Sequence, residues 1–81
     1  MLTGRQLRGA RSMLGMTQKA VAEAAGVSEP TVKRLESQDG ELNGHSSTIA
    51  AIRRALEAGG IEFIPQNGGG PGVRMRKEHH D

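Results

Sequence analysis

The sequence predicts a mainly α-helical fold: a bundle of four or five short helices that includes a helix-turn-helix, followed by a small C-terminal β-hairpin. Through residues 1–59 the apolar residues recur at helical spacing, and each such stretch follows a Ser or Thr suited to an N-cap. From Gly60 onward, β-branched residues and a glycine-rich turn replace that pattern. Only 35% of the 81 residues are apolar and Phe63 is the one aromatic residue, so close packing of small side chains must form the core.

The first helix is expected to run from an N-cap at Thr3 to about Leu14. Gln6, three residues after the cap, completes a capping box, and Leu2 and Leu7 have the spacing of a hydrophobic staple. A glycine then ends the helix.

The next two helices are expected to lie close together in the chain. Thr17 caps a helix over Gln18–Ala25, and Gly26 can adopt the left-handed conformation that a tight turn requires. Ser28 caps a third helix that ends near Ser37, with a proline in its first turn, where the missing N–H costs no helical bond.

The remaining segments comprise a loop, a fourth helix and the hairpin. Residues 38–45 are rich in turn residues, and Ser46 or Ser47 is expected to cap a helix that runs through Ala58. Two strands, about 61–64 and 73–76, flank a Gly/Pro-rich turn. The predicted organisation is a helical domain at 1–59, a hairpin at 60–76 that serves dimerisation, and a disordered polar tail at 77–81.

Composition narrows the class of protein. The chain has no cysteine, which leaves neither disulfides nor a thiolate zinc site, and we expect a cytoplasmic location. No apolar run approaches about 20 residues, and the N-terminus lacks the apolar stretch of a signal peptide, so no membrane association is expected. The net charge of +2 suits a nucleic-acid partner, although a solvated surface with this charge is equally common.

We expect no enzymatic activity, because the chain has no Ser/His/Asp set on rigid elements and too little length for a cleft. The glycines at 68–72 are followed by no Lys-Ser/Thr pair, which indicates a flexible turn and not a phosphate-binding loop. The adjacent histidines 79 and 80 make a poor metal site. No catalytic residue, metal or cofactor is therefore predicted.

The segment 17–37 has the form of a helix-turn-helix, a unit shaped to lay its second helix in the major groove of duplex DNA. It reads Gln-Lys-Ala-Val-Ala at 18–22, Gly-Val-Ser at 26–28 and Thr-Val-Lys-Arg-Leu-Glu at 31–36. This pattern resembles the core motif of the Xre or Cro/CI-type repressors, which include the lambdoid phage repressors, over about residues 5–58. The resemblance implies a lambda-repressor-like bundle and a sequence-specific DNA-binding regulator. The hairpin resembles a subset of very short bacterial regulators of that family, which lack an effector or cleavage domain.

The resemblance also implies roles for individual residues. A Gln that opens the second helix typically bonds a phosphate, and residues after the third helix's cap read bases. The phosphate contacts expected on this basis or from position are Gln18, Thr17, Ser28, Lys19, Asn43 and His45. The expected base contacts are Glu29, Pro30, Thr31, Lys33 and Arg34.

Several of these roles have a simpler alternative. Arg34 can bond guanine O6 and N7 in a bidentate manner, or it can be an ordinary solvated arginine. Lys33 can contact phosphate instead of a base, and Glu29 is explained equally well by the helix dipole or by bonding cytosine N4. Pro30 departs from the Gln or Ser common in the family and offers only apolar contact, for example with a thymine methyl. Thr31 is the better candidate for a hydrogen bond.

The family commonly pairs an Arg of the first helix with the Glu that closes the third. In this chain the pair falls on Arg11 and Glu36, as a structural ion pair that orients the two helices or as two independent surface charges.

A helix-turn-helix unit contacts only a few base pairs, so we expect a homodimer on a two-fold symmetric operator. The apolar residues of the hairpin exceed what so small a chain is expected to bury, and they are predicted to form the dimer interface by side-chain packing or strand pairing: Ile61, Phe63, Val73 and Met75. The alternative function is an antitoxin-type autorepressor that also binds a toxin, and a third is an interaction module without DNA. RNA polymerase is a further candidate partner, although no residue in the sequence indicates a surface for it.

Overall fold

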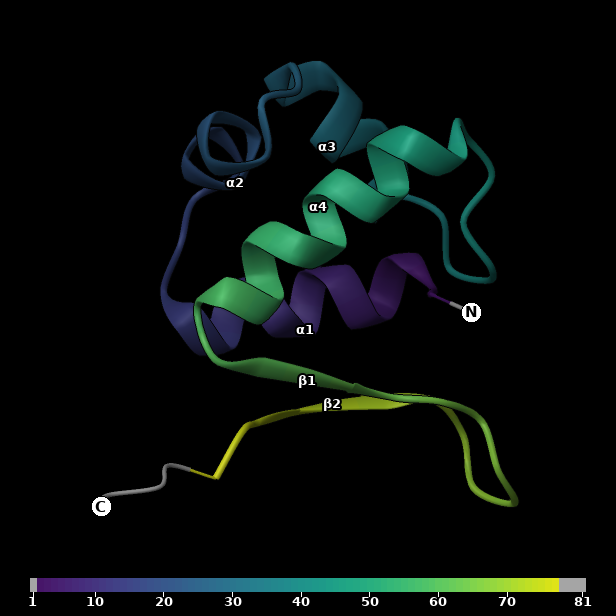
Figure 1. The fold of residues 1–81 in the computed structure, drawn as a ribbon. Helices are drawn as coiled ribbons and strands as arrows, with labels where there is room; N and C mark the ends of the chain where they lie inside the picture. The colour runs from purple at the N-terminus through teal and green to yellow at the C-terminus, as the bar shows by residue number, and fades with distance from the viewer. Residues whose placement is uncertain (1, 78–81) are drawn as a thin grey trace.

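The computed structural model describes residues 2–77 and consists of four helices and a two-stranded antiparallel sheet (Figure 1). This agrees with the predicted fold class. The elements in chain order are α1 (Gly4–Leu14), α2 (Gln18–Ala25), α3 (Glu29–Glu36), α4 (Ser46–Ala58), β1 (Ile61–Ile64) and β2 (Gly72–Met75). Of the predicted tail, residues 78–81 and the two histidines among them lie outside the described residues.

The first helix begins as its capping signals predict. The Thr3 Oγ1 accepts the Gln6 backbone N–H at 3.1 Å, and the Gln6 Oε1 accepts the Thr3 backbone N–H at 2.9 Å, which completes the capping box. The cap of α4 differs from the prediction. Its N-cap residue is His45, without a side-chain hydrogen bond, and both Ser46 and Ser47 are already helical. Neither serine therefore has the extended backbone that an N-cap residue adopts.

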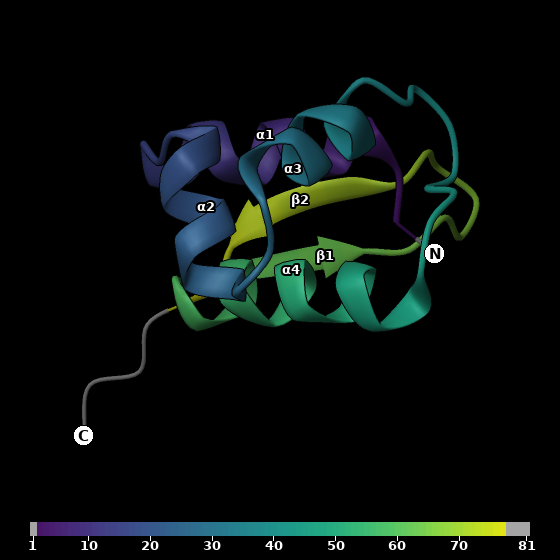
Figure 2. The same ribbon diagram turned by 90° about the horizontal axis from the view of Figure 1, so that it is seen from above.

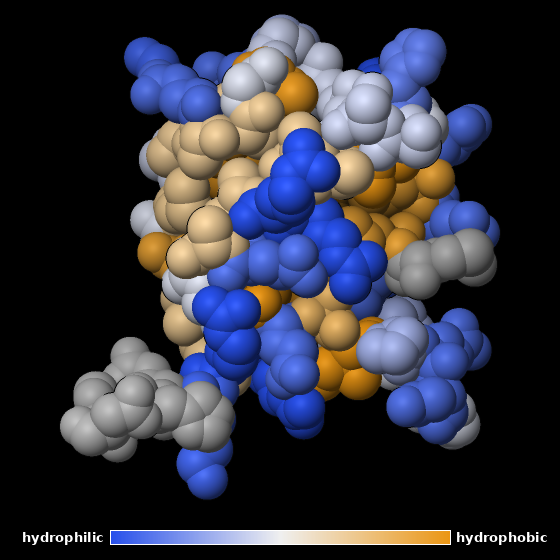
Figure 3. All heavy atoms as spheres, viewed as in Figure 1, coloured by the Kyte–Doolittle hydropathy of each residue, from blue (hydrophilic) through white to orange (hydrophobic). Residues whose placement is uncertain are grey.

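The elements form three layers, with α2 and α3 on one side, α1 and α4 in the middle and the hairpin on the other side (Figure 1). Viewed from above, β2 lies on the α1 side and β1 on the α4 side (Figure 2). On the side where α4 and β1 face the viewer, hydrophilic side chains cover the middle of the molecule (Figure 3). The core draws on every layer, and its largest fully buried side chains are Leu7, Leu35, Ile52, Leu56, Ile61, Val21 and Val32.

The hairpin packs against the helices with the face that carries the four residues predicted for the dimer interface. Ile61 lies opposite Met75 and Phe63 opposite Val73, so these four side chains share the face of the hairpin that meets the helices. Ile61 and Phe63 are 1% and 8% exposed, and Val73 packs partly buried against the same core. Two of the four residues predicted for the dimer interface, Ile61 and Phe63, are therefore buried within the chain itself, because the hairpin folds back onto α1 and α4. Met75 alone of the four is exposed, at 46%.

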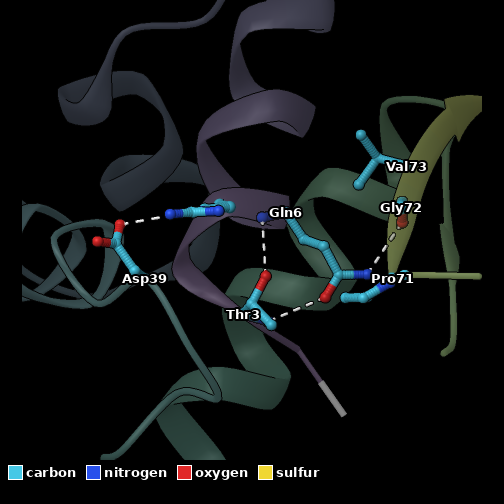
Figure 4. A pocket seen from close by; sticks show the side chains of 8 residues that line it. Thr3, Gln6, Asp39, Pro71, Gly72 and Val73 are labelled. Carbon is cyan, nitrogen blue, oxygen red and sulfur yellow. Dashed lines mark hydrogen bonds and ion pairs between the residues drawn. The ribbon is translucent and has the colours of Figure 1, made fainter.

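Gln6 fastens the hairpin to α1 (Figure 4). Its side chain is buried, and its Nε2 donates to the backbone oxygens of Ile64 at 3.2 Å and Gly72 at 2.9 Å, one from each strand. A pocket of about 450 Å³ lies beside this contact, between the start of α1 and the hairpin turn. The spacing in the sequence predicts only the capping-box role of Gln6, and its bonds to the strands depend on the folded hairpin.

Gly4 allows the start of α1 to meet the end of α3 at very close range. A Cβ atom at this position would lie 2.7 Å from the Leu35 backbone oxygen and closer still to that of Gln38. The loop after α3 adds backbone bonds to the N-terminal segment: the Gly4 N–H donates to the Gly40 oxygen at 3.3 Å, and the Leu42 N–H to the Leu2 oxygen at 2.9 Å. The N-terminal segment and this loop therefore support each other.

Candidate nucleic-acid interface

The helix-turn-helix is formed by α2, a three-residue turn at 26–28 and α3. The Thr17 Oγ1 accepts the Ala20 N–H at 3.0 Å and so caps α2. Gly26 then adopts a left-handed conformation with φ 72°, which few residues other than glycine tolerate, and its N–H bonds the last turn of α2. The Ser28 Oγ accepts the Thr31 N–H at 3.2 Å and caps α3. The predicted caps and turn are thus all present.

One face of α3 points away from the protein. Val32, Leu35 and Glu36 are buried beneath the helix, while the base-contact candidates Glu29, Pro30, Lys33 and Arg34 are exposed. Thr31 is the exception among the candidates, because it is half-buried. Its hydroxyl lies 2.7 Å from the Ser28 Oγ, so each hydroxyl already has a partner within the cap.

The loop after α3 contacts the side chain of Arg34. The Arg34 Nη1 donates to the backbone oxygen of Asn43 at 3.4 Å. The Gln38 side chain binds both backbone groups of Asn43: its Nε2 donates to the oxygen at 3.2 Å, and its Oε1 accepts the N–H at 2.6 Å. Gln38 thereby fixes the loop at the point where the loop meets Arg34, a role that no signal in the sequence indicated.

A buried carboxylate joins the three helices behind this face. Glu36 is 3% exposed, and its two carboxylate oxygens accept hydrogen bonds from Arg11 Nε at 2.8 Å and Arg11 Nη2 at 3.0 Å. The Gln18 Nε2 donates to the same carboxylate at 3.1 Å, and the Arg11 Nη1 donates to the Met16 backbone oxygen at 3.1 Å. The hydrogen bond that Arg11 donates to the Glu36 carboxylate raises the pKa of Arg11, so the guanidinium stays charged. Arg11 and Glu36 are therefore an ion pair that links α1 to α3, with Gln18 as the link to α2.

Arg8 is a second link between α1 and α3 that sequence analysis did not identify. Its Nη1 donates to the Glu36 backbone oxygen at the end of α3, and its Nη2 lies 3.3 Å from the Asp39 Oδ1. A cation at a helix C-terminus is favourable because the last carbonyl groups carry partial negative charge. A shallow depression of about 280 Å³ opens beside these contacts and is lined by Arg8, Arg11, Gln18, Lys33, Glu36 and Ser37.

The phosphate-contact candidates occupy two places. Thr17, Gln18, Lys19 and Ser28 lie at the starts of α2 and α3, and all but Gln18 are exposed. Gln18 is half-buried, with one amide hydrogen committed to Glu36 and the second left without a partner among the described residues. The other two candidates, Asn43 and His45, are exposed in the loop between α3 and α4.

The described residues hold no group of three or more His, Cys, Asp or Glu side chains arranged for a metal ion. Within residues 2–77, no helix combines the length and the apolar character needed to cross a bilayer.

This arrangement of two capped helices, a glycine turn and an outward-facing second helix defines the chain as a DNA-binding domain of the helix-turn-helix class. Comparison with protein-family models agrees, since a model described as a helix-turn-helix domain matches residues 3–63. The chain belongs to that family. Comparison with curated proteins gave no match.

Proposed function

We propose that the protein is a sequence-specific transcription regulator that binds duplex DNA as a homodimer, with α3 in the major groove. The observation that carries this proposal is the exposed face of α3, where Glu29, Pro30, Lys33 and Arg34 stand on a helix whose opposite face is locked into the core. The major groove is about 12 Å wide and admits one helix, so side chains on such a face can meet base edges. The proposed activity is binding alone, and no catalytic residue is assigned.

Arg34 is the residue proposed to contribute most to base recognition. A guanidinium can bond guanine O6 and N7 together, a contact worth about 1–3 kcal/mol of discrimination. Asn43 bonds the Arg34 side chain weakly, at 3.4 Å, which restricts its position and leaves it exposed. Lys33 and Glu29 flank it on the same helix and are proposed as further contacts, with Pro30 limited to apolar contact. Thr31 would first have to release its hydroxyl from Ser28.

The phosphate contacts are proposed at the ends of the helices. The second amide hydrogen of Gln18 has no partner within residues 2–77, and Gln18 lies at the first turn of α2, where backbone N–H groups favour an anion. Cationic Arg8 and Lys33 line the depression next to it, and these charges attract the DNA backbone. Thr17, Lys19 and Ser28 extend this set, and the remaining two proposed contacts are Asn43 and His45.

We favour a regulator over the antitoxin alternative because of the hairpin. An antitoxin would usually add a toxin-binding extension longer than the hairpin at residues 60–76. Ile61 and Phe63 are also committed to the core of the same chain.

The test begins with selection of a binding site from a library of random DNA duplexes, followed by titration of the selected duplex. Arg34→Ala is expected to weaken binding to that duplex by about 5- to 150-fold and to relax the preference at one base pair. Lys33→Ala is expected to reduce the salt dependence of binding, if it contacts phosphate, by about one unit of slope.

Arg54→Ala is the matched control. Arg54 is an exposed arginine of α4, so this substitution removes the same charge at a position outside α3. It is expected to leave binding within about twofold, because surface charges remote from the DNA contribute little. If the selection yields no preferred sequence, or if Arg34→Ala and Arg54→Ala bind alike, α3 does not read bases and the proposal fails.

A further inference from the structure

The geometry points to the outer edge of β2 as the surface where a second copy of this chain binds, forming a continuous sheet across the two hairpins. This inference rests on the proposed function, because it names the interface of the proposed dimer. Four observations carry it: unpaired backbone groups, two exposed methionines, the charge pattern of the strand and the direction in which α3 faces.

The backbone groups of Val73 and Met75 point away from β1. The Arg76 N–H donates to the Gly60 oxygen at 2.6 Å, which makes residues 60 and 76 a hydrogen-bonded pair. Hydrogen-bonded and non-hydrogen-bonded pairs alternate in an antiparallel ladder, so Val73 and Met75 belong to non-hydrogen-bonded pairs. Their N–H and C=O groups therefore lie along the free edge, ready to bond another strand.

The two exposed large hydrophobic residues of the described chain lie on this same flank. They are Met13 and Met75, each 46% exposed. A Cβ at Gly9 would lie 3.3 Å from the Val73 side chain, so this side of α1 faces β2. Met13 follows Gly9 by one helical turn and Met75 follows Val73 by two strand positions, and both steps keep a residue on the same face. Apolar surface and free strand edge thus coincide.

The charge pattern selects one register for a two-fold symmetric pairing. If the two-fold axis passed through Arg74, the two guanidinium groups would lie directly opposite each other, which is unfavourable. An axis through Val73 instead places Arg74 opposite Gly72 of the second copy and Met75 opposite Pro71 of the second copy. In that register each Arg74 keeps its ion pair with Glu62 of its own chain, and the Met75 N–H meets a proline carbonyl.

The same pairing leaves both recognition helices on one side. A two-fold axis at the β2 edge, perpendicular to the sheet, sets the hairpins side by side and keeps both α2–α3 layers above the joined sheet (Figure 1, Figure 2). The chain measures 38 × 30 × 20 Å, so two copies side by side are separated by a distance comparable with one turn of DNA, about 34 Å.

The edge of β1 is less suited to a second copy. Hydrophilic side chains run down the middle of the face formed by α4 and β1 (Figure 3), and the Arg53 guanidinium lies 5.6 Å from the centre of the Phe63 ring.

The experiment is sedimentation equilibrium of the full chain up to millimolar concentration, with each variant's melting temperature recorded. The wild type and Met75→Leu are expected to form dimers, twice the chain mass of 8.6 kDa. Met75→Pro removes an outward N–H that the hairpin itself does not use, and it is expected to raise the dimer dissociation constant about tenfold or more, because the loss occurs in both copies.

A second pair of variants covers the case in which Met75→Pro fails to fold. Met13→Lys places a charge in the proposed interface, and Ser12→Lys adds the same charge at an exposed neighbouring position, turned about 100° round α1 from Met13. Only Met13→Lys is expected to weaken the dimer, again by about tenfold. A monomeric wild type, or dimers that withstand both Met75→Pro and Met13→Lys, would overturn the inference.

Binding to a duplex with a single half-site separates this inference from the proposed function. Met75→Pro is expected to bind a single half-site as well as the wild type does, because α3 is unchanged. If every variant and the wild type fail to bind any selected DNA, the proposed function fails, and the sedimentation result still decides the interface.

Discussion

Arg11→Met is expected to destabilise the domain more than Glu36→Leu, although each variant removes one partner of the same ion pair. The reason is unequal burial: the Glu36 side chain is 4% exposed, and the Arg11 side chain is 25% exposed. Arg11→Met leaves a buried carboxylate whose remaining side-chain donor is Gln18, and such a loss typically costs about 3–5 kcal/mol. Glu36→Leu leaves a guanidinium that can turn toward water, and we expect a cost of about 1–3 kcal/mol.

The double variant distinguishes this reasoning from simple loss of contacts. Two well-packed apolar side chains often replace a buried ion pair at little cost, so Arg11→Met with Glu36→Leu is expected to be more stable than Arg11→Met alone. The coupling between the two sites should therefore be about 2 kcal/mol or more. A domain of this length has a total stability of only about 4–12 kcal/mol, so the difference is readily measured.

Urea unfolding followed by far-UV circular dichroism is the suitable assay, because α1 to α4 dominate the signal and the transition midpoint reports the free energy of unfolding. If Glu36→Leu lowers the free energy of unfolding more than Arg11→Met does, unequal burial is not the reason for the difference. Additive effects of the two changes would contradict the existence of a coupled pair.

Gly4→Ala is expected to cost about 3 kcal/mol or more and to lower the melting temperature by more than about 10 °C, because a Cβ there collides with backbone at the end of α3, whereas Gly40→Ala meets no atom within 4 Å and should melt like the wild type. Gln38→Ala is expected to relax the base preference at the position read by Arg34 and to leave the salt dependence of DNA binding unchanged. If Gln38→Ala shows the wild-type base preference in the same selection, Gln38 does not position Arg34. The hydrogen bond from Arg74 on the neighbouring strand lowers the pKa of Glu62. The contribution of this ion pair to stability is therefore complete above the ordinary glutamate pKa of about 4.3, and it is lost as the pH falls through the lowered pKa. In acid titrations, Glu62→Gln should lose stability less steeply than the wild type below about pH 4, and identical curves would exclude a contribution from this pair.

The local signals in the sequence located the helices well. Thr3, Thr17 and Ser28 each cap a helix as predicted, because an N-cap depends on a side chain and a backbone N–H three residues away. The exposed face of α3 could also be predicted, since helical periodicity assigns Val32 and Leu35 to the core.

Contacts between distant segments could not be predicted in this way. Ile61 and Phe63 have the composition of an interface, and only the return of the hairpin onto α1 and α4 shows that the same chain buries them. Arg8 and Gln38 resemble ordinary surface residues in the sequence, because their partners include backbone groups whose positions depend on the whole fold.

The two hydrogen bonds from Gln6 to the strands also bear on operator spacing. The hairpin is bonded to α1 through Gln6, and α1 is bonded to α3 through Arg8 and Arg11, so a continuous series of contacts leads from the edge of β2 to the recognition helix. A dimer joined at that edge would hold its two recognition helices at one fixed separation. Inserting a single base pair between the half-sites would then shift one of them by about 3.4 Å and rotate it about the DNA axis, and the protein has no hinge in this series of contacts to follow it.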